Sequence, residues 1–126
     1  MTFQRILITG GRDFTNQKMI NHVLDTYTNR GDTLIVGGAR GVDTIAEQFA
    51  FRKGRAVDRH MADWERYGKR AGYIRNHEMV HSGADLCIAF PGGRGTANCV
   101  EQARKAGIAV FEVPSSWDDP HILQAP

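Results

Sequence analysis

The chain has 126 residues, a formal net charge of +2 and two cysteines. Its length predicts a single domain spanning residues 1–126 that buries enough surface to fold without a disulfide or a metal ion. The small positive charge is too weak to indicate a nucleic-acid-binding protein but permits an anionic ligand, and the cysteine spacing fits neither a zinc site nor a redox motif.

Short apolar runs alternate with segments whose apolar residues recur at helical spacing. In chain order we expect a strand over 5–9, a helix over 16–30, a strand over 33–36, a helix over 43–53, a strand near 56–60, a helix over 69–82, a strand over 85–90, a helix over 96–106 and a strand over 108–113. Gly31, Gly54 and Gly107 end three of the helices. The tail 114–126 is expected to be irregular, with one helical turn around Asp118.

This alternation predicts an α/β fold: one Rossmann-like, doubly wound domain with a mostly parallel five-stranded sheet and helices on both faces. Its core covers about residues 5–113. In such sheets a ligand binds beyond the carboxyl ends of the strands, where the strand order reverses.

No apolar stretch approaches the roughly 18–20 residues that span a membrane, and only a short apolar run follows Arg5 near the N-terminus. Cys87 lies in an apolar run and is expected to be a buried, reduced residue. We therefore expect a cytoplasmic protein that has no membrane partner.

Three glycine-rich turns, at 10–13, 37–43 and 91–96, each carry an arginine and follow an expected strand. A single Gly-Gly pair is explained as well by a tight turn, but three such turns at one sheet edge favour an anion site, because helix N-termini and arginines bind phosphate. The candidate phosphate-binding residues are Gly10, Gly11, Arg12, Gly37, Gly38, Arg40, Gly92, Gly93, Arg94, Gly95 and Thr96.

The segment 62–76 is polar and aromatic and follows the third strand, so it is expected to fold over the same edge. Trp64 either stacks on a base or fills the core, and Asp63 is either a ribose acceptor or an exposed surface residue. The expected sugar and base pocket consists of Asp13, Trp64, Arg75, Asn76 and Asn98.

Other chemistries lack their motifs. No turn matches the P-loop pattern GxxxxGK[ST], the first turn does not match GxGxxG, and neither Ser115 nor Ser116 lies in a nucleophile elbow. His77 and His81 are spaced as metal ligands would be on a helix but have no suitable third ligand. We expect no metal and no cofactor.

Taken together, the motifs GGRDF at 10–14, GGARGVD at 37–43, ADW at 62–64, IRNHEM at 74–79 and FPGGRGTAN at 90–98 resemble the YspA/cpYpsA-related branch of the SLOG superfamily, which groups Smf/DprA-type and LOG-type Rossmannoid domains. The resemblance spans about residues 5–113. It implies a nucleotide-like small-molecule ligand and a homodimer.

LOG proteins are phosphoribohydrolases that cut the N-glycosidic bond of nucleoside 5′-monophosphates, and their signature resembles PGGxGTxxE. This chain matches the PGGxGT part, but Cys99 stands where the signature has glutamate. A second LOG pattern, RKxxM, is matched by Arg75 and Met79 but has Asn76 in place of lysine. If the resemblance extends to catalysis, the carboxylate must come from elsewhere, and the candidate catalytic residues are Asp43, Asp63 and Glu101.

Two uses of the site therefore stay open: a binder or sensor of a nucleotide, or a LOG-like N-glycosidase. The alternative is a DprA-like module that binds single-stranded nucleic acid, which the low net charge disfavours. A purely structural domain would make the three glycine–arginine turns a coincidence.

Overall fold

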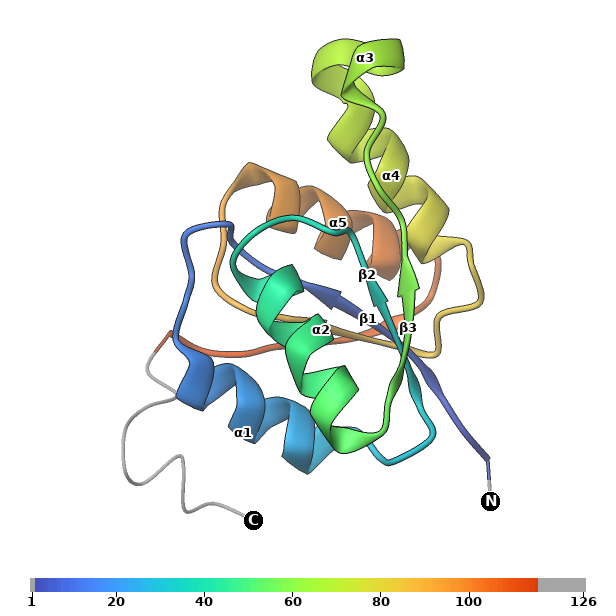
Figure 1. Ribbon diagram of the computed structural model, residues 1–126. Helices are drawn as coiled ribbons and strands as arrows, with labels where there is room; N and C mark the ends of the chain where they lie inside the picture. The colour runs from blue at the N-terminus through green and yellow to red at the C-terminus, as the bar shows by residue number, and fades with distance from the viewer. Residues whose placement is uncertain (1, 116–126) are drawn as a thin grey trace.

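Five parallel strands form one sheet in the order β3-β2-β1-β4-β5 in the computed structural model, which describes residues 2–115 (Figure 1). The strands are β1 (Arg5–Thr9), β2 (Thr33–Val36), β3 (Ala56–Arg59), β4 (Leu86–Ala89) and β5 (Ala109–Glu112). All four neighbouring pairs are parallel, so the predicted α/β, doubly wound fold is confirmed. The helical turn expected around Asp118 lies outside the described residues.

Helices cover both faces of the sheet, as predicted. The helical segments are α1 (Gln17–Tyr27), α2 (Val42–Lys53), α3 (Trp64–Tyr67), the 3₁₀ turn η1 (Gly68–Arg70), α4 (Ala71–Val80) and α5 (Arg94–Lys105). The helices α1 and α2 lie side by side on one face, and α4 and α5 lie side by side on the other (Figure 1).

Two helices differ from the sequence prediction. The first ends at Tyr27 rather than near residue 30, because Thr28 is extended and its hydroxyl donates to the carbonyl of Leu24. The segment expected as one helix over 69–82 consists of the end of η1 followed by α4, which ends at Val80, and the short helix α3 before it was not expected. In Figure 1, α3 projects beyond the carboxyl edge of the sheet.

The core has two layers because alternate strand residues point to opposite faces of the sheet. Ile6 and Ile8 of β1 pack with α1 and α2, whereas Leu7 packs toward α4 and α5. Cys87 and Cys99 belong to the second layer and are fully buried free thiols, so Cys87 has the predicted hydrophobic role.

The sheet reverses its strand order at β1, which pairs with β2 on one side and β4 on the other. The chain runs outward from β1 through β2 to β3 and then returns to β4 beyond β1. The turns after β1 and β4 are joined by a hydrogen bond from Gly11 N–H to the Pro91 carbonyl at 2.9 Å, and beyond it they diverge toward helices on opposite faces. Such divergence opens a crevice at the carboxyl edge, which is where doubly wound sheets bind ligands.

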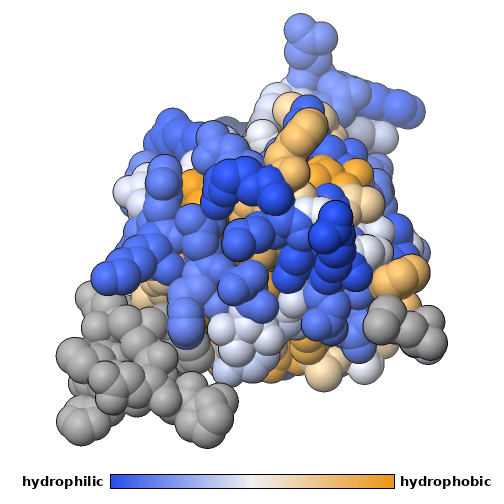
Figure 2. All heavy atoms as spheres, turned by 60° about the horizontal axis from the view of Figure 1, so that its bottom comes forward, coloured by the Kyte–Doolittle hydropathy of each residue, from blue (hydrophilic) through white to orange (hydrophobic). Residues whose placement is uncertain are grey.

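None of the helices within residues 2–115 is both long and apolar enough to cross a bilayer. Figure 2 shows the molecule from the side of α1, which lies at the bottom of Figure 1. This face is mostly hydrophilic, with separate small apolar areas.

Gly41 joins the turn after β2 to the turn after β1. It has a φ of +76°, and a Cβ there would lie 2.4 Å from the carbonyl oxygen of Arg12 and 2.5 Å from that of Gly11. The next residue, Val42, donates its N–H to the same Gly11 oxygen. Glycine is therefore required here both by its backbone conformation and by close packing.

We predict that Gly41→Ala lowers the free energy of unfolding by about 1–3 kcal/mol, because the methyl group strains the backbone and separates the two turns. Urea unfolding measures the change. Gly95→Ala is the matched control: a Cβ at Gly95, in the first turn of α5, meets nothing within 4 Å, so this variant should lose no stability. Equal losses in both variants would contradict this account of Gly41.

Candidate nucleotide-binding cleft

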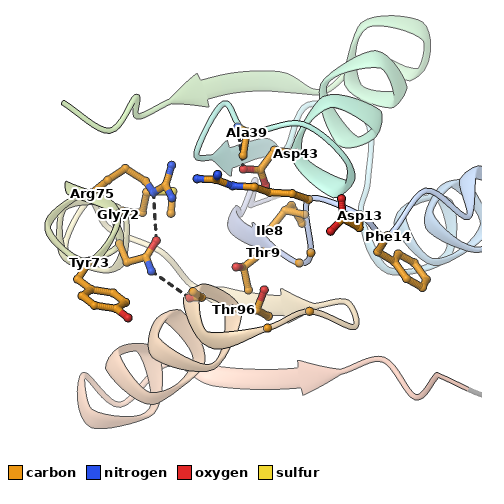
Figure 3. A pocket seen from close by; sticks show the side chains of 18 of the residues that line it. Ile8, Thr9, Asp13, Phe14, Ala39, Asp43, Gly72, Tyr73, Arg75 and Thr96 are labelled. Atoms are coloured by element: carbon orange, nitrogen blue, oxygen red, sulfur yellow. Dashed lines mark hydrogen bonds between the residues drawn. The ribbon is translucent and has the colours of Figure 1, made fainter. Parts of the chain in front are cut away.

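A cleft of about 730 Å³ lies at the carboxyl edge of the sheet, between the turns that follow β1 and β4. The end of β1, the starts of α2 and α5, and one side of α4 form its walls (Figure 3). The predicted site residues that line it are Gly10, Gly11, Arg12, Asp13, Asp43, Trp64, Arg75, Asn76, Gly92, Gly93, Gly95 and Thr96.

A smaller cavity of about 300 Å³ adjoins this cleft. We call the larger cavity the phosphate lobe, after the ligand proposed for it below, and the smaller cavity the arginine lobe, after the three arginines that line it. Gly37, Gly38 and Arg40 line the arginine lobe, and Arg12, Trp64 and Arg75 line both. All three glycine-rich turns thus meet at one edge, as the sequence pattern predicted, but they are divided between two lobes.

The first turn of α5 forms one wall of the phosphate lobe. A Cβ at Gly92 would lie 2.2 Å from Thr96 Oγ1, so packing explains that glycine. A Cβ at Gly93 or Gly95 would meet nothing within 4 Å, and neither residue has a positive φ. No described side chain caps α5. The backbone N–H groups of this turn are therefore accessible to a ligand at the positive end of the helix.

A chain of hydrogen bonds crosses the cleft floor from β2 to α5. Arg75 donates from Nη1 to the carbonyl oxygen of Gly37 at 2.8 Å and from Nε to Asn76 Oδ1 at 3.1 Å. Asn76 donates from Nδ2 to the carbonyl oxygen of Gly95 at 3.1 Å (Figure 3). Because Asn76 is only 3% exposed and its amide is engaged on both sides, it holds Arg75 and the α5 turn in register.

Asn98 supports this arrangement from outside both lobes. Its Oδ1 accepts from Asn76 Nδ2 at 3.2 Å and from Gln102 Nε2 at 2.7 Å. Gln102 also donates to the backbone carbonyl of Tyr73 at 3.2 Å, which ties α5 to α4. Asn98 thus braces the residues that line the cleft rather than lining it itself.

Asp43 is the buried carboxyl of the site. It lies in the first turn of α2, lines the phosphate lobe and is 7% exposed. Burial raises its pKa to about 6, although backbone N–H donation from Ala39 at 3.1 Å and the positive charge of Arg75 act in the opposite direction. In Figure 3, Asp43 and Arg75 point into the cavity from α2 and α4. Asp43 can therefore exchange a proton near neutral pH.

The other two predicted catalytic carboxylates line neither lobe. Asp63 caps α3, where its Oδ1 accepts from the backbone N–H of Arg66 at 3.1 Å. Glu101 lies on the exposed surface of α5 and pairs with Lys105 at 2.9 Å. These contacts give both residues structural partners away from the cleft, and Asp43 is the one of the three that lines it.

The arginines of the three turns occupy different positions. The guanidinium of Arg12 lies over the ring of Trp64, 5.6 Å from its centroid. Arg40 pairs with Asp13 at 3.0 Å on the surface, and Arg94 is exposed and lines neither lobe. Trp64 is 49% exposed, so it is not a core residue, and its ring is available to a ligand.

Sequence reasoning missed Thr9 and Tyr73, which also line the phosphate lobe. Thr9 is the last residue of β1, directly before Gly10-Gly11, and that position was a usable signal. Tyr73 lies three residues before Asn76 on α4, so helical spacing would have placed it on the same side.

His77 and His81 stack on α4 with ring centroids 4.1 Å apart, and His81 Nδ1 lies 2.9 Å from the carbonyl oxygen of His77.

The sequence profile of the YspA, cpYpsA-related SLOG family matches residues 4–67. The chain belongs to this family. A similar protein is the Gene 61 protein of Mycobacterium phage D29, which is 44% identical and is aligned over 86% of this chain and 94% of its own length. The match therefore extends over most of both proteins.

A solved structure with the same fold is DNA processing protein A (DprA) from Streptococcus pneumoniae. The TM-score is 0.76 at 19% identity, over 93% of this chain and 52% of that one. The chain thus spans about half the length of this DprA. At this level of identity, the similarity establishes a shared fold.

We predict that Asp43 makes the protein less stable as the pH rises from about 4 to 6. In this interval the folded state holds a proton on Asp43, whose pKa is about 6, whereas the unfolded state, with a pKa of 3.8, has already lost it. Stability therefore falls with rising pH. Urea unfolding of wild type and Asp43→Asn should show the variant gaining up to about 3 kcal/mol relative to wild type between pH 4 and 7. Parallel pH profiles would contradict this.

Proposed function

We propose that the cleft binds a nucleotide or a nucleotide-derived phosphate, with the phosphate on the first turn of α5. The observation that carries this proposal is the pair of glycines Gly93 and Gly95. Packing does not require either glycine, and both line the phosphate lobe at the uncapped end of a 12-residue helix. Backbone N–H groups at such an end favour phosphate, and glycine lets the phosphate approach closely.

The rest of the lobe suits a nucleoside. Trp64 and Tyr73 are 49% and 45% exposed and line the phosphate lobe, so each offers an aromatic surface to a base. Arg75 and Asp43 supply a donor and an acceptor for the sugar hydroxyls. Asp13 lines the same lobe, but it is exposed and pairs with Arg40.

The wider setting of this proposal follows from the family and the cysteines. Membership of the SLOG family, whose domains include nucleotide-binding members, supports a nucleotide ligand. Two fully buried free thiols, Cys87 and Cys99, suit a reducing compartment, which supports the cytoplasm as the place of action. A homodimer is part of the proposal and rests on the resemblance to LOG proteins.

A second candidate function is hydrolysis of the N-glycosidic bond of the same nucleotide, and Asp43 is the observation that favours it. Cys99, at the position of the LOG glutamate, is fully buried and has a pKa raised to about 11 by burial, so it offers no charge to the cleft. The Asp43 carboxylate would take a proton from water as the water oxygen bonds to C1′ and the C1′–N bond breaks, and the departing base would take up a proton. The same carboxylate would stabilise the positive charge that develops on the sugar.

One experiment tests both candidates. The purified protein is incubated at pH 7.5 with ribo- and deoxyribonucleoside 5′-monophosphates, and mass spectrometry measures the nucleotide retained by the protein and the free base in solution. Retained, intact nucleotide is expected for a binder, and free base for a hydrolase. If neither appears, the nucleotide proposal fails, and retention of single-stranded DNA at low salt would instead favour the nucleic-acid function that the fold shared with DNA processing protein A suggests.

Two variants assign the result to the site. Gly95→Ala should reduce nucleotide retention at least ten-fold while the protein stays folded, because its methyl group occupies the approach to the α5 turn. Asp43→Asn should abolish base release. Lys105→Ala, at the other end of α5, is the control and should change neither quantity. Unchanged retention by Gly95→Ala would contradict the proposed phosphate position.

A further inference from the structure

The arginine lobe has a different charge from the phosphate lobe. Among the described residues, three arginines line it and no aspartate or glutamate does, whereas Asp13 and Asp43 both line the phosphate lobe. Its volume is about 300 Å³, and Met61 and Trp64 supply its apolar surface. A small cavity that gathers three guanidinium groups without a carboxylate attracts an anion.

The two lobes adjoin each other. Arg12, Trp64 and Arg75 line both cavities, together with Ala39. A molecule seated on the α5 turn would enter the arginine lobe by extending past these shared residues. One ligand can occupy both cavities, with its middle beside Trp64 and Arg75.

From this arrangement we propose that the arginine lobe binds a second anionic group of the same ligand, which is therefore a nucleotide with an anionic group at each end, such as a nucleoside 3′,5′-bisphosphate. The inference rests on the proposed function, because the first phosphate is the one on the α5 turn. The second group lies among Arg12, Arg40 and Arg75.

Arg12 and Arg40 are held by weak contacts. Arg75 donates hydrogen bonds to uncharged acceptors, and its charge also acts on the Asp43 carboxyl. Arg40 pairs with Asp13, but their side chains are 73% and 92% exposed, and such pairs contribute little. Arg12 lies over the ring of Trp64, and Arg75 donates to the uncharged carbonyl of Gly37. A phosphate that enters the lobe would displace the exposed Asp13 at little cost and would give all three guanidinium groups a charged acceptor.

The backbone of Gly37 and Gly38 passes close to the side chains of Arg75 and Met61, which also line the arginine lobe. Gly38 has a φ of +71°, and a Cβ there would lie 2.2 Å from the sulfur of Met61. A Cβ at Gly37 would lie 2.6 Å from Arg75 Nη1. This turn leads into α2, where Asp43 in the first turn offsets the positive end of the helix, so the attraction for an anion in this lobe comes from the arginines.

The test compares two ligands that differ by one phosphate. Isothermal titration measures the affinity of the protein for the 5′-monophosphates of adenosine, guanosine, cytidine and uridine and for the matching 3′,5′-bisphosphates. For at least one base, we expect the bisphosphate to bind at least ten-fold more tightly. Equal affinities for monophosphate and bisphosphate of every base would overturn the inference and leave the proposed function standing, whereas no binding of any nucleotide would contradict both.

Arg40→Gln assigns the second phosphate to the arginine lobe. Arg40 is exposed, so the variant is expected to fold as wild type does, which circular dichroism checks. The ratio of bisphosphate to monophosphate affinity, measured on the variant itself, should fall most of the way to one. Arg66→Gln is the matched control, because Arg66 lies over the ring of Tyr67 and lines neither lobe. A bisphosphate gain that survives Arg40→Gln would overturn the assignment to this lobe.

Discussion

The hydrogen bonds that run from Gly37 through Arg75 and Asn76 to Gly95 join the two halves of the sheet across its open edge. At this edge the turns after β1 and β4 lead to helices on opposite faces, and a backbone hydrogen bond from Gly11 N–H to the Pro91 carbonyl at 2.9 Å joins them just beyond the strands. Arg75 and Asn76 come from α4, so the position of this helix sets the width of the cleft. The α5 turn, the Arg75 guanidinium and the end of β2 therefore keep a fixed relation that a ligand can use.

The glycines of the cleft serve two different physical purposes. Gly41 and Gly92 are required by the packing of the protein itself, because a Cβ at either position would collide with a neighbouring turn or side chain. Gly93 and Gly95 face open space. The first pair brings the turns together, and the second pair leaves their backbone accessible. This distinction turns a glycine-rich motif, which by itself is compatible with simple tight turns, into an argument for a ligand.

The fold and the meeting of the three glycine-rich turns at one sheet edge could be predicted from sequence, because continuous apolar strands and glycine-ended helices are local signals. The roles of single side chains could not, since they depend on contacts between distant segments. Asp63 was a candidate ribose acceptor or catalytic carboxylate and caps α3. Asn76, expected in the sugar and base pocket, lines the cleft and also braces Arg75 and Gly95. The exposure of Trp64 likewise follows from the projection of α3 beyond the sheet edge, which depends on tertiary structure.

The central claim is that phosphate lies on the first turn of α5, and amide chemical shifts test it most directly. Proton–nitrogen spectra of labelled protein are recorded during titration with a nucleoside 5′-monophosphate and, separately, with the same nucleoside without phosphate. We expect the amides of Gly93, Gly95 and Thr96 to shift most in the titration with the 5′-monophosphate and not in the titration with the bare nucleoside. Largest shifts elsewhere in the chain, or equal shifts with the bare nucleoside, would contradict it.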